Sequence, residues 1–188
     1  IEVGTPFNFE PDWPARRLQA YPKSAASLIV PEFDTALGVT SLREGSLSAR
    51  DFTWGFDESW KPGVVFNTRI ESAMKSTWRD SMGHRRCIIP VASFYETHRD
   101  ETVVSQRTGK PVKRQYEFRV PGQNVILIGG IWRGESFSMV TTEANEDMAP
   151  IHHRMPLIVR QEELPLWLGP DYQELADRSS IKLEAEPA

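Results

Sequence analysis

The sequence predicts an α+β domain built around a mostly antiparallel β-sheet. Three observations support this prediction. Many short apolar segments end at proline, glycine or polar residues, a single central stretch has helical spacing, and strands do not alternate with helices as they do in a parallel sheet. The chain has 188 residues. This length suits one well-buried domain, so we expect residues 1–188 to form a single unit.

The strands are predicted from short apolar runs bounded by breaks. The first 25 residues hold four prolines and are expected to form an irregular lead-in. The segments expected to be strands after it are Ala26–Val30, Thr35–Thr40, Leu47–Trp54, Arg86–Glu96 with an interruption at Pro90, Tyr116–Val120, Val125–Trp132, Phe137–Thr142 and Leu157–Val159.

The helices and connections are predicted from spacing and turn signals. Ile70–Ser81 repeats its apolar residues at helical intervals, with Thr68 as a candidate cap and Gly83 as a stop. Residues 98–113 are polar and are expected to form an exposed connection with a turn at Thr108-Gly109-Lys110. The remaining expectations are short helices at Glu162–Leu168 and Tyr172–Ala176 and a disordered tail at 178–188.

Composition excludes several classes of protein. The chain has no apolar run of about 18 residues, and its first residues lack the basic and apolar regions of a signal peptide, so we expect a soluble, cytoplasmic protein. The single cysteine, Cys87, excludes an internal disulfide framework, and its apolar neighbours favour a small buried side chain over a nucleophile. Because His98, His152 and His153 form no helical H-x-x-x-H pair, we expect no metal and no cofactor.

The net charge of −4 does not exclude nucleic acid, because the charge is unevenly spread. Residues 161–188 carry seven acidic and two basic side chains, which leaves 20 basic and 19 acidic side chains in the rest of the chain. Most of these bases are arginines, which bind phosphate in a bidentate manner. Local placement must therefore decide whether the chain binds DNA.

Two residues are candidates for acid–base chemistry. Glu96 follows Phe94 and Tyr95, and apolar neighbours would raise its pKa toward the useful range, although from spacing alone an exposed carboxylate at a strand end is the better interpretation. His152 precedes a turn that ends at Pro156, where a histidine is more often structural than catalytic. Adjacent His153 cannot share a strand face with it, so we expect only one of the two to point into a pocket.

Polar and aromatic residues elsewhere remain open to two interpretations. Asn67 and Arg69 alternate along an extended segment and could share one face, while a turn or cap role for Asn67 is about as frequent. Trp54 and Trp60 flank a loop-like stretch. They are either core residues or platforms on which unpaired bases stack.

Taken together, six segments resemble the SRAP family of abasic-site processing proteins. They occur in family order over about residues 17–165, and their combination is specific although each is weak alone. The segments are Trp54-Gly55 with Trp60, Asn67-Thr68-Arg69-Ile70-Glu71, Arg86-Cys87-Ile88-Ile89-Pro90 leading to Phe94-Tyr95-Glu96, Gly129-Gly130-Ile131-Trp132, Thr141-Thr142-Glu143-Ala144-Asn145 and Ile151-His152-His153-Arg154-Met155-Pro156.

The resemblance implies a barrel-like sheet with a few peripheral helices and a specific chemistry. An N-terminal cysteine would attack the aldehyde of an abasic site in single-stranded DNA through its amine and thiol, closing a thiazolidine crosslink. Glu96 would transfer protons, His152 would promote Schiff-base formation and reversal, and Asn67 would orient the sugar. The implied DNA contacts are Arg69, Arg154, Trp54, Trp60 and Arg86.

The same resemblance implies a crosslinking or lyase-type enzyme that processes its own N-terminus. It would act as a cytoplasmic monomer that joins the nucleoid during DNA damage. The family's opening Cys-Gly-Arg is absent, because the sequence begins at Ile1. Since Asn67, Glu96 and His152 remain, we favour a missing N-terminal segment over a divergent, phage-borne member that binds without crosslinking.

One further departure concerns the pocket wall, because Thr97 stands where the family has an aromatic residue. Two alternatives to a crosslinking sensor stay open. One is a non-catalytic module of the same fold that binds single-stranded DNA. The other is a peptidase that acts mainly on its own N-terminus.

Overall fold

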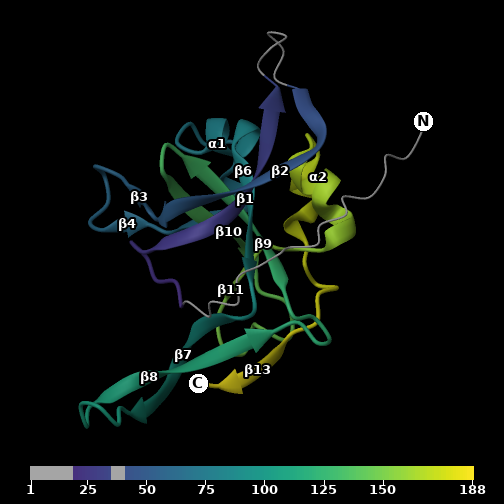
Figure 1. Cartoon of the computed structure of the whole chain (residues 1–188). Coiled ribbons are helices and arrows are strands. Elements are labelled where there is room, and N and C mark those ends of the chain that lie inside the picture. Colours follow the sequence, from purple (N-terminus) through teal and green to yellow (C-terminus); the bar gives the residue numbers. More distant parts are fainter. Residues whose placement is uncertain (1–18, 35–40) are drawn as a thin grey trace.

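The computed structural model describes residues 19–34 and 41–188 (Figure 1). Strands dominate this part of the chain, and the helices are short. The strands are β1 (Ala25–Asp34), β2 (Ser41–Trp54), β3 (Phe56–Asp57), β4 (Val64–Val65), β5 (Asn67–Arg69), β6 (Arg86–Val91), β7 (Phe94–Val104), β8 (Pro111–Arg119), β9 (Ile126–Arg133), β10 (Ser136–Glu143), β11 (Arg154–Pro156), β12 (Ile158–Val159) and β13 (Glu184–Pro187). The helices are α1 (Arg79–His84), α2 (Leu164–Leu168) and the 3₁₀ turns Ile70–Ser72, Gln161–Glu163 and Tyr172–Ala176.

The main sheet closes into a small barrel. Its order is β11-β10-β2-β1-β6-β9-β12, and β10 also pairs with β9, so that β10, β2, β1, β6 and β9 form a ring. Most pairings are antiparallel, while β10 runs parallel to β2 and to β5. The predicted α+β class and the barrel-like, mostly antiparallel sheet are therefore confirmed.

Two hydrophobic clusters fill the two faces of the barrel strands. Along β1, Leu28 and Val30 belong to one cluster and Ile29 to the other, as the period of two in a strand requires. On β9, a Cβ added to Gly129 would lie 2.9 Å from the ring of Trp167, and one added to Gly130 would lie 2.9 Å from Cys87 Sγ. The paired glycines therefore allow α2 on one side and β6 on the other to approach closely.

A second sheet, of order β13-β8-β7, projects from the barrel as a ribbon (Figure 1). Residues 98–113, expected to be an exposed connection, are exposed but form most of this ribbon, so the prediction of a connection is wrong apart from the turn, where Gly109 has φ of +66°. Both faces of the outer ribbon are exposed, and its strands therefore lack the apolar alternation that reveals a half-buried strand. The tail prediction for 178–188 is also wrong, because Ile181 and Leu183 are buried and β13 pairs with β8.

The predicted helix at Ile70–Ser81 forms only in part. A 3₁₀ turn covers Ile70–Ser72, turns follow, and α1 begins at Arg79, so successive turns rather than one helix bury the apolar residues. Thr68 is not a cap, because it lies in β5 with Oγ1 at 2.9 Å from Ser138 Oγ. Gly83 lies inside α1 rather than ending it.

The other sequence-based boundaries need smaller corrections. The break between β6 and β7 falls at Ala92-Ser93 rather than at Pro90, and Tyr172–Ala176 is a 3₁₀ turn. Thr35–Thr40 and most of the lead-in lie outside the described residues. In the part of the chain that is described, each helix is too short or too polar to span a lipid bilayer.

Candidate functional site

Three segments that are far apart in the sequence meet near β10: two of them pair with this strand, and the third contacts the segment before β11. Strand β5 pairs with β10 in parallel, with Arg69 opposite Thr141. Strand β11 pairs with the end of β10 in antiparallel, with Arg154 opposite Glu143. The root of β7 joins them, because the backbone N–H of Arg99 donates to the carbonyl of Ile151 at 3.2 Å. The fold therefore gathers the Asn67, Glu96 and His152 segments at one end of the barrel.

Glu96 and His152 form a half-buried pair. Oε2 of Glu96 lies 3.9 Å from Nδ1 of His152, and the two side chains are 20% and 26% exposed. Burial raises the pKa of Glu96, while the charge of His152 and the N–H of Thr97 act in the lowering direction and offset it only in part. A carboxyl group held this way can keep a proton closer to neutral pH than a solvated one.

The tautomer of His152 follows from its neighbours. Nδ1 lies 2.9 Å from the carbonyl oxygen of Arg154 and 3.9 Å from the Glu96 carboxylate, and both are acceptors. The backbone N–H of Arg154, at 3.2 Å, would instead need a lone pair on Nδ1. Because the closer contact and the carboxylate both favour an N–H, we assign the proton to Nδ1, which leaves Nε2 as the basic nitrogen.

Arg154 is fixed by Glu71. Its Nη1 and Nη2 donate to the two carboxylate oxygens at 2.9 Å each, and Nη2 also donates to the carbonyl of Thr141 at 2.9 Å. Partial burial acts to raise the pKa of Glu71, but the hydrogen bonding of Arg154, a backbone hydrogen bond and the charges of Arg154 and Arg69 together lower the pKa below its ordinary value. The guanidinium is thus already oriented and partly neutralised before any ligand binds.

Asn67 presents an unused acceptor. Its backbone lies opposite Met139 in the β5–β10 ladder, and its buried Oδ1 has no hydrogen-bond partner. A buried carbonyl oxygen without a donor costs about 1–3 kcal/mol. Such an atom is a natural place for a ligand to supply the missing donor.

An open, basic cleft of about 560 Å³ lies beside the Glu96–His152 pair. Its lining residues are Arg69, Arg99, Glu143, Ala144, Ala149, His153 and Arg154. Burial and the neighbouring His152 lower the pKa of His153, and the three arginines lower it further. The rings of the two histidines are 4.5 Å apart; His152 contacts Glu96 through Nδ1, and His153 lines the cleft.

Arg99 and His153 are two charged or titratable residues of the cleft to which the sequence analysis assigned no role. Arg99 lies in the segment that was expected to be an exposed connection, and its place beside the cleft follows from β7 and from the hydrogen bond of its backbone to Ile151. His153 was set aside because adjacent side chains alternate. The two side chains do have different neighbours, but both neighbours belong to the candidate site: His152 contacts Glu96, and His153 lines the cleft.

Arg86 is buried inside the body of the protein, and the expectation that it contacts DNA is therefore wrong. Its guanidinium donates to the carbonyls of Trp167 at 2.7 Å, Leu168 at 2.9 Å and Met82. It also lies 4.2 Å from the ring centre of Tyr172. Burial lowers its pKa to about 10, although Tyr172 acts in the raising direction. The side chain joins α1, α2 and the barrel.

The two tryptophans lie outside the lining of the cleft. Trp54 donates from Nε1 to the carbonyl of Phe66 at 2.8 Å and stacks on Phe137 at 6.1 Å between ring centres, which is the packing of a core residue. Trp60 is 60% exposed and touches Trp78 edge-on. A role for either ring in stacking on bases stays a prediction.

Cys87 is unsuited to nucleophilic chemistry. It is free and fully buried, and burial raises the pKa of its thiol far above the usual range. Since a thiolate is the reactive form, this thiol is inert at neutral pH. Among the described residues, no three side chains of the metal-binding kinds gather in one place.

The family pattern described as SOS response associated peptidase (SRAP) matches residues 8–187. Abasic site processing protein YoqW of Bacillus subtilis (strain 168) is 30% identical over 132 residues, which are 62% of this chain and 55% of that protein. YobE of the same strain is 29% identical over 116 residues, 56% of this chain and 49% of that protein. YedK of Escherichia coli (strain K12), also described as an abasic site processing protein, is 26% identical over 161 residues, 80% of this chain and 67% of that protein.

This chain spans about half the length of the Bacillus relatives. Solved structures share the fold. A phage-related protein of Bordetella bronchiseptica superposes with a TM-score of 0.64 at 20% identity, covering 94% of this chain and 86% of that one. A protein of Bacteroides thetaiotaomicron gives 0.57 at 24% identity, covering 74% and 68%. At these identities the likeness concerns the fold alone.

Proposed function

Because this chain belongs to the SRAP family, we propose that it binds single-stranded DNA and processes abasic sites in it. The family pattern covers almost the whole chain, and relatives described as abasic site processing proteins match it. The observation that carries the proposal is the Glu96–His152 pair at the edge of an arginine-lined cleft. That arrangement joins proton transfer to phosphate binding.

The cleft supplies the binding half of the proposed activity. Arg69 and Arg99 line it, and among the described residues neither guanidinium is held in an ion pair with a carboxylate. Arg154 is held by Glu71, so we assign it to orienting the strand rather than to the first encounter with phosphate. A basic groove of this kind binds the backbone regardless of sequence, with an affinity that falls as salt rises.

The Glu96–His152 pair supplies the chemical half. An abasic deoxyribose is reactive only in its ring-opened aldehyde form, and opening the ring needs a proton to be moved from the hydroxyl to the ring oxygen. The raised pKa of Glu96 suits it to shuttle that proton, and the free Nε2 of His152 is available as a base. Oδ1 of Asn67 would accept a hydrogen bond from the sugar hydroxyl.

We assign the covalent step to an N-terminal cysteine, which would lie before Ile1. Its amine and the aldehyde would condense to an imine with loss of water, and its thiol would add to the imine carbon to close a thiazolidine. An α-amine titrates near pH 8, so it is nucleophilic at neutral pH without strong tuning. Cys87 cannot take this role, because its thiol is buried.

The test is a denaturing gel. The protein with its natural N-terminus is mixed with a single-stranded oligonucleotide that contains one abasic site, with the intact oligonucleotide, and with the abasic one after borohydride reduction of its aldehyde. We expect a shifted band with the first only. No band with the abasic strand overturns the covalent proposal, and equal bands with all three overturn the assignment to abasic sites.

A further inference from the structure

His153 is a titratable residue of the cleft that the proposed function leaves without a role. It is exposed, and its carbonyl accepts the backbone N–H of Ala144 at 3.3 Å, which places it beside the end of β10. Among the described residues, its ring lies against the ring of His152, but neither ring nitrogen takes part in a hydrogen bond. His152, in contrast, has its Nδ1 next to the carbonyl of Arg154. The imidazole of His153 therefore has both nitrogens available to a ligand in the cleft.

Positive charge surrounds this imidazole from several elements of the fold. Arg69 extends from β5, Arg99 from β7 and Arg154 from β11, and all three line the cleft with His153. Glu143, at the end of β10, is the acidic residue of the lining. The three guanidinium groups outnumber this one carboxylate, so the cleft is already positive before His153 takes up a proton.

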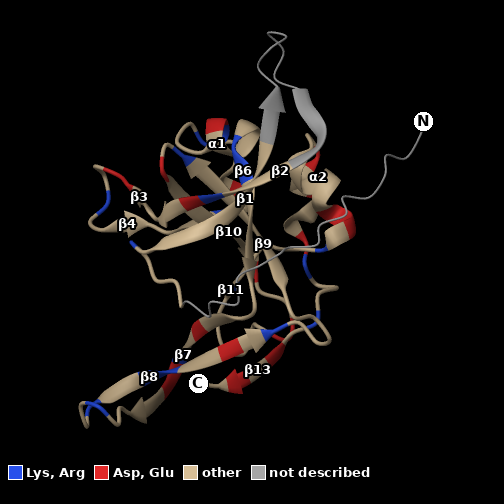
Figure 2. Cartoon of the chain, in the orientation of Figure 1, with Lys and Arg blue, Asp and Glu red and all other residues tan. Residues whose placement is uncertain are grey.

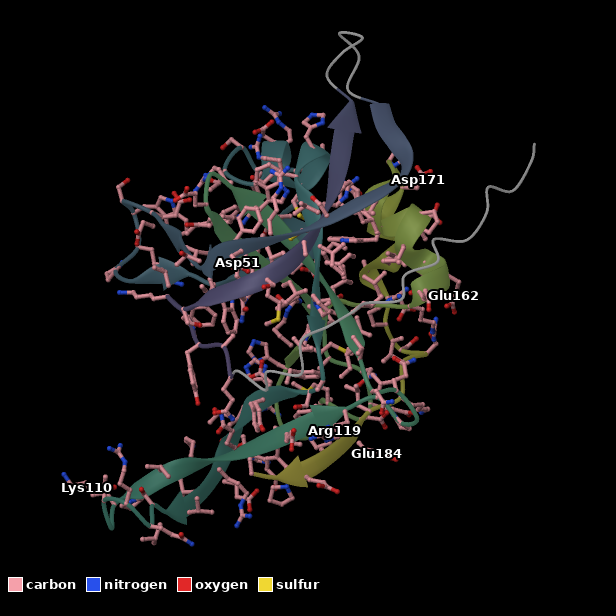
Figure 3. All side chains as sticks on the ribbon, in the orientation of Figure 1. Asp51, Lys110, Arg119, Glu162, Asp171 and Glu184 are labelled. Carbon is pink, nitrogen blue, oxygen red and sulfur yellow. The ribbon has the colours of Figure 1, made fainter. Side chains whose placement is uncertain are left out.

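The acidic C-terminal segment does not line the cleft. Figure 2 shows acidic residues around α2 and on β13, and Figure 3 labels Glu162 and Asp171 beside α2 and Glu184 on β13. None of these three residues belongs to the lining of the cleft. Because a concave surface of one sign raises the local concentration of the opposite charge, the cleft favours an anionic ligand such as a DNA phosphate.

The same positive field favours the neutral imidazole in the free protein. Desolvation lowers the pKa of His153 below its ordinary value of 6.5, and the charges of His152 and of the three arginines lower it further. A phosphate in the cleft acts in the opposite direction, because a negative charge nearby stabilises the imidazolium. A bound phosphate and a proton on His153 should therefore stabilise each other.

We propose that His153 is a phosphate ligand that holds the single strand as an imidazolium, so that DNA binding takes up a proton from solvent. The proton enters on a ring nitrogen, and the new N–H donates to a phosphate oxygen in a charge-assisted hydrogen bond. The inference rests on the proposed function, which places the strand in the cleft.

The inference adds a dependence on pH to the binding of DNA. Between the pKa of His153 in the free protein and its higher pKa in the complex, the complex holds more protons than the free protein. Affinity for single-stranded DNA should therefore rise as the pH falls through this window. Above and below the window, His153 has the same protonation state in both forms and contributes no dependence on pH.

The experiment uses two substitutions that fix the charge of this side chain. His153→Gln is neutral at every pH, and His153→Arg is positive at every pH. His84→Gln, at an exposed histidine of α1 outside the cleft, is the matched control. Fluorescence anisotropy measures the binding of each protein to an intact single-stranded oligonucleotide at about pH 8 and about pH 5.5. Calorimetry in two buffers of different ionisation enthalpy counts the protons taken up.

We expect the parent to bind like His153→Gln at pH 8 and like His153→Arg at pH 5.5. At the lower pH, His153→Gln should bind about fivefold more weakly than the parent, with a logarithmic salt slope smaller by about 0.7, because one phosphate contact is lost. The parent should take up more protons on binding than either variant of His153. The His84→Gln protein should match the parent in affinity and in proton uptake.

Two results would overturn the inference in different ways. If the parent binds the strand and its affinity changes with pH in parallel with that of His153→Gln, the imidazole takes up no proton on binding, and the proposed function stands without it. If the parent binds no single strand at either pH, the proposed function fails and the inference fails with it.

Discussion

The candidate site, which is the cleft with the Glu96–His152 pair beside it, and the outer half of the β7–β8 ribbon, residues 102–113, here called the arm, both carry basic groups, but they are built in opposite ways. In the candidate site the charged groups are oriented by other protein groups: Arg154, which lines the cleft, by Glu71, and His152, beside the cleft, by a carbonyl and by Glu96. In the arm, Arg107 and Lys110 extend into solvent from a turn. Oriented, half-buried groups suit chemistry that depends on geometry, while solvated cations suit contacts that depend on salt.

This contrast predicts its largest effect at Glu96. The Glu96→Gln substitution keeps the shape and removes the titrating group, so we expect covalent adduct formation with an abasic single strand to slow by about 100-fold or more. Quenched time courses on denaturing gels measure the rate, and anisotropy on the stable analogue checks that DNA binding is retained. An unchanged rate would show that the buried carboxyl takes no part in the chemistry.

A smaller effect is expected for Arg69, an exposed arginine of the cleft. Arg69→Ala should weaken binding of a single-stranded oligonucleotide about tenfold and reduce its logarithmic salt slope by about 0.7, because one phosphate contact is lost. Arg79→Ala, at an exposed position outside the cleft, is the matched control. If both variants bind equally well, the single strand does not run along the arginines of the cleft.

The Glu96–His152 pair of the candidate site should also carry a cost in stability. Since the folded pKa of Glu96 is raised above its ordinary value of 4.5, its contribution is fully present below that value and is lost as the pH rises through the folded pKa. Glu96→Gln should therefore increase the free energy of unfolding at pH 7 by roughly 1 kcal/mol, the size of a typical single substitution, and gain little below pH 4.5. Urea unfolding at the two pH values measures the difference, and destabilisation at pH 7 would contradict it.

The arm should carry no such cost. Arg107→Gln with Lys110→Gln touches two exposed side chains, so we expect the free energy of unfolding to stay within about 0.5 kcal/mol of the parent. Thermal unfolding at low and high salt gives the comparison. A marked loss of stability would mean that the tip is held by contacts that its exposed cations do not suggest.

Much of the barrel and the meeting of the three segments could be predicted from the sequence. Apolar strands such as Val125–Trp132 show their pattern directly, and the ordered motifs around Asn67, Glu96 and His152 indicated one site. The arm could not be predicted this way, because a ribbon exposed on both faces has no buried side to mark it. Ile181 and Leu183 were too few apolar residues to reveal a packed tail.

Arginines were the least predictable part of the site. Arg86 and Arg69 both lie next to apolar residues in the sequence. In the structure, Arg86 is surrounded by carbonyls at the ends of α1 and α2, whereas Arg69 lines the cleft. A guanidinium can satisfy its five donors with backbone oxygens or with phosphates, and only the tertiary structure decides between them. The position of Arg99 in the cleft could not be predicted either, because the sequence did not indicate that this residue lies in a strand.

The central claim is that the Glu96–His152 pair carries out the chemistry and that the arm takes no part in it. The most direct test is the rate of adduct formation with a single-stranded abasic oligonucleotide. The rate is measured for the parent, for His152→Gln and for the arm variant Arg107→Gln with Lys110→Gln. We predict that the parent and the arm variant react at the same rate and that His152→Gln is slower by about 100-fold. An arm variant as slow as His152→Gln, or a His152→Gln protein as fast as the parent, would contradict the assignment of the chemistry to the Glu96–His152 pair.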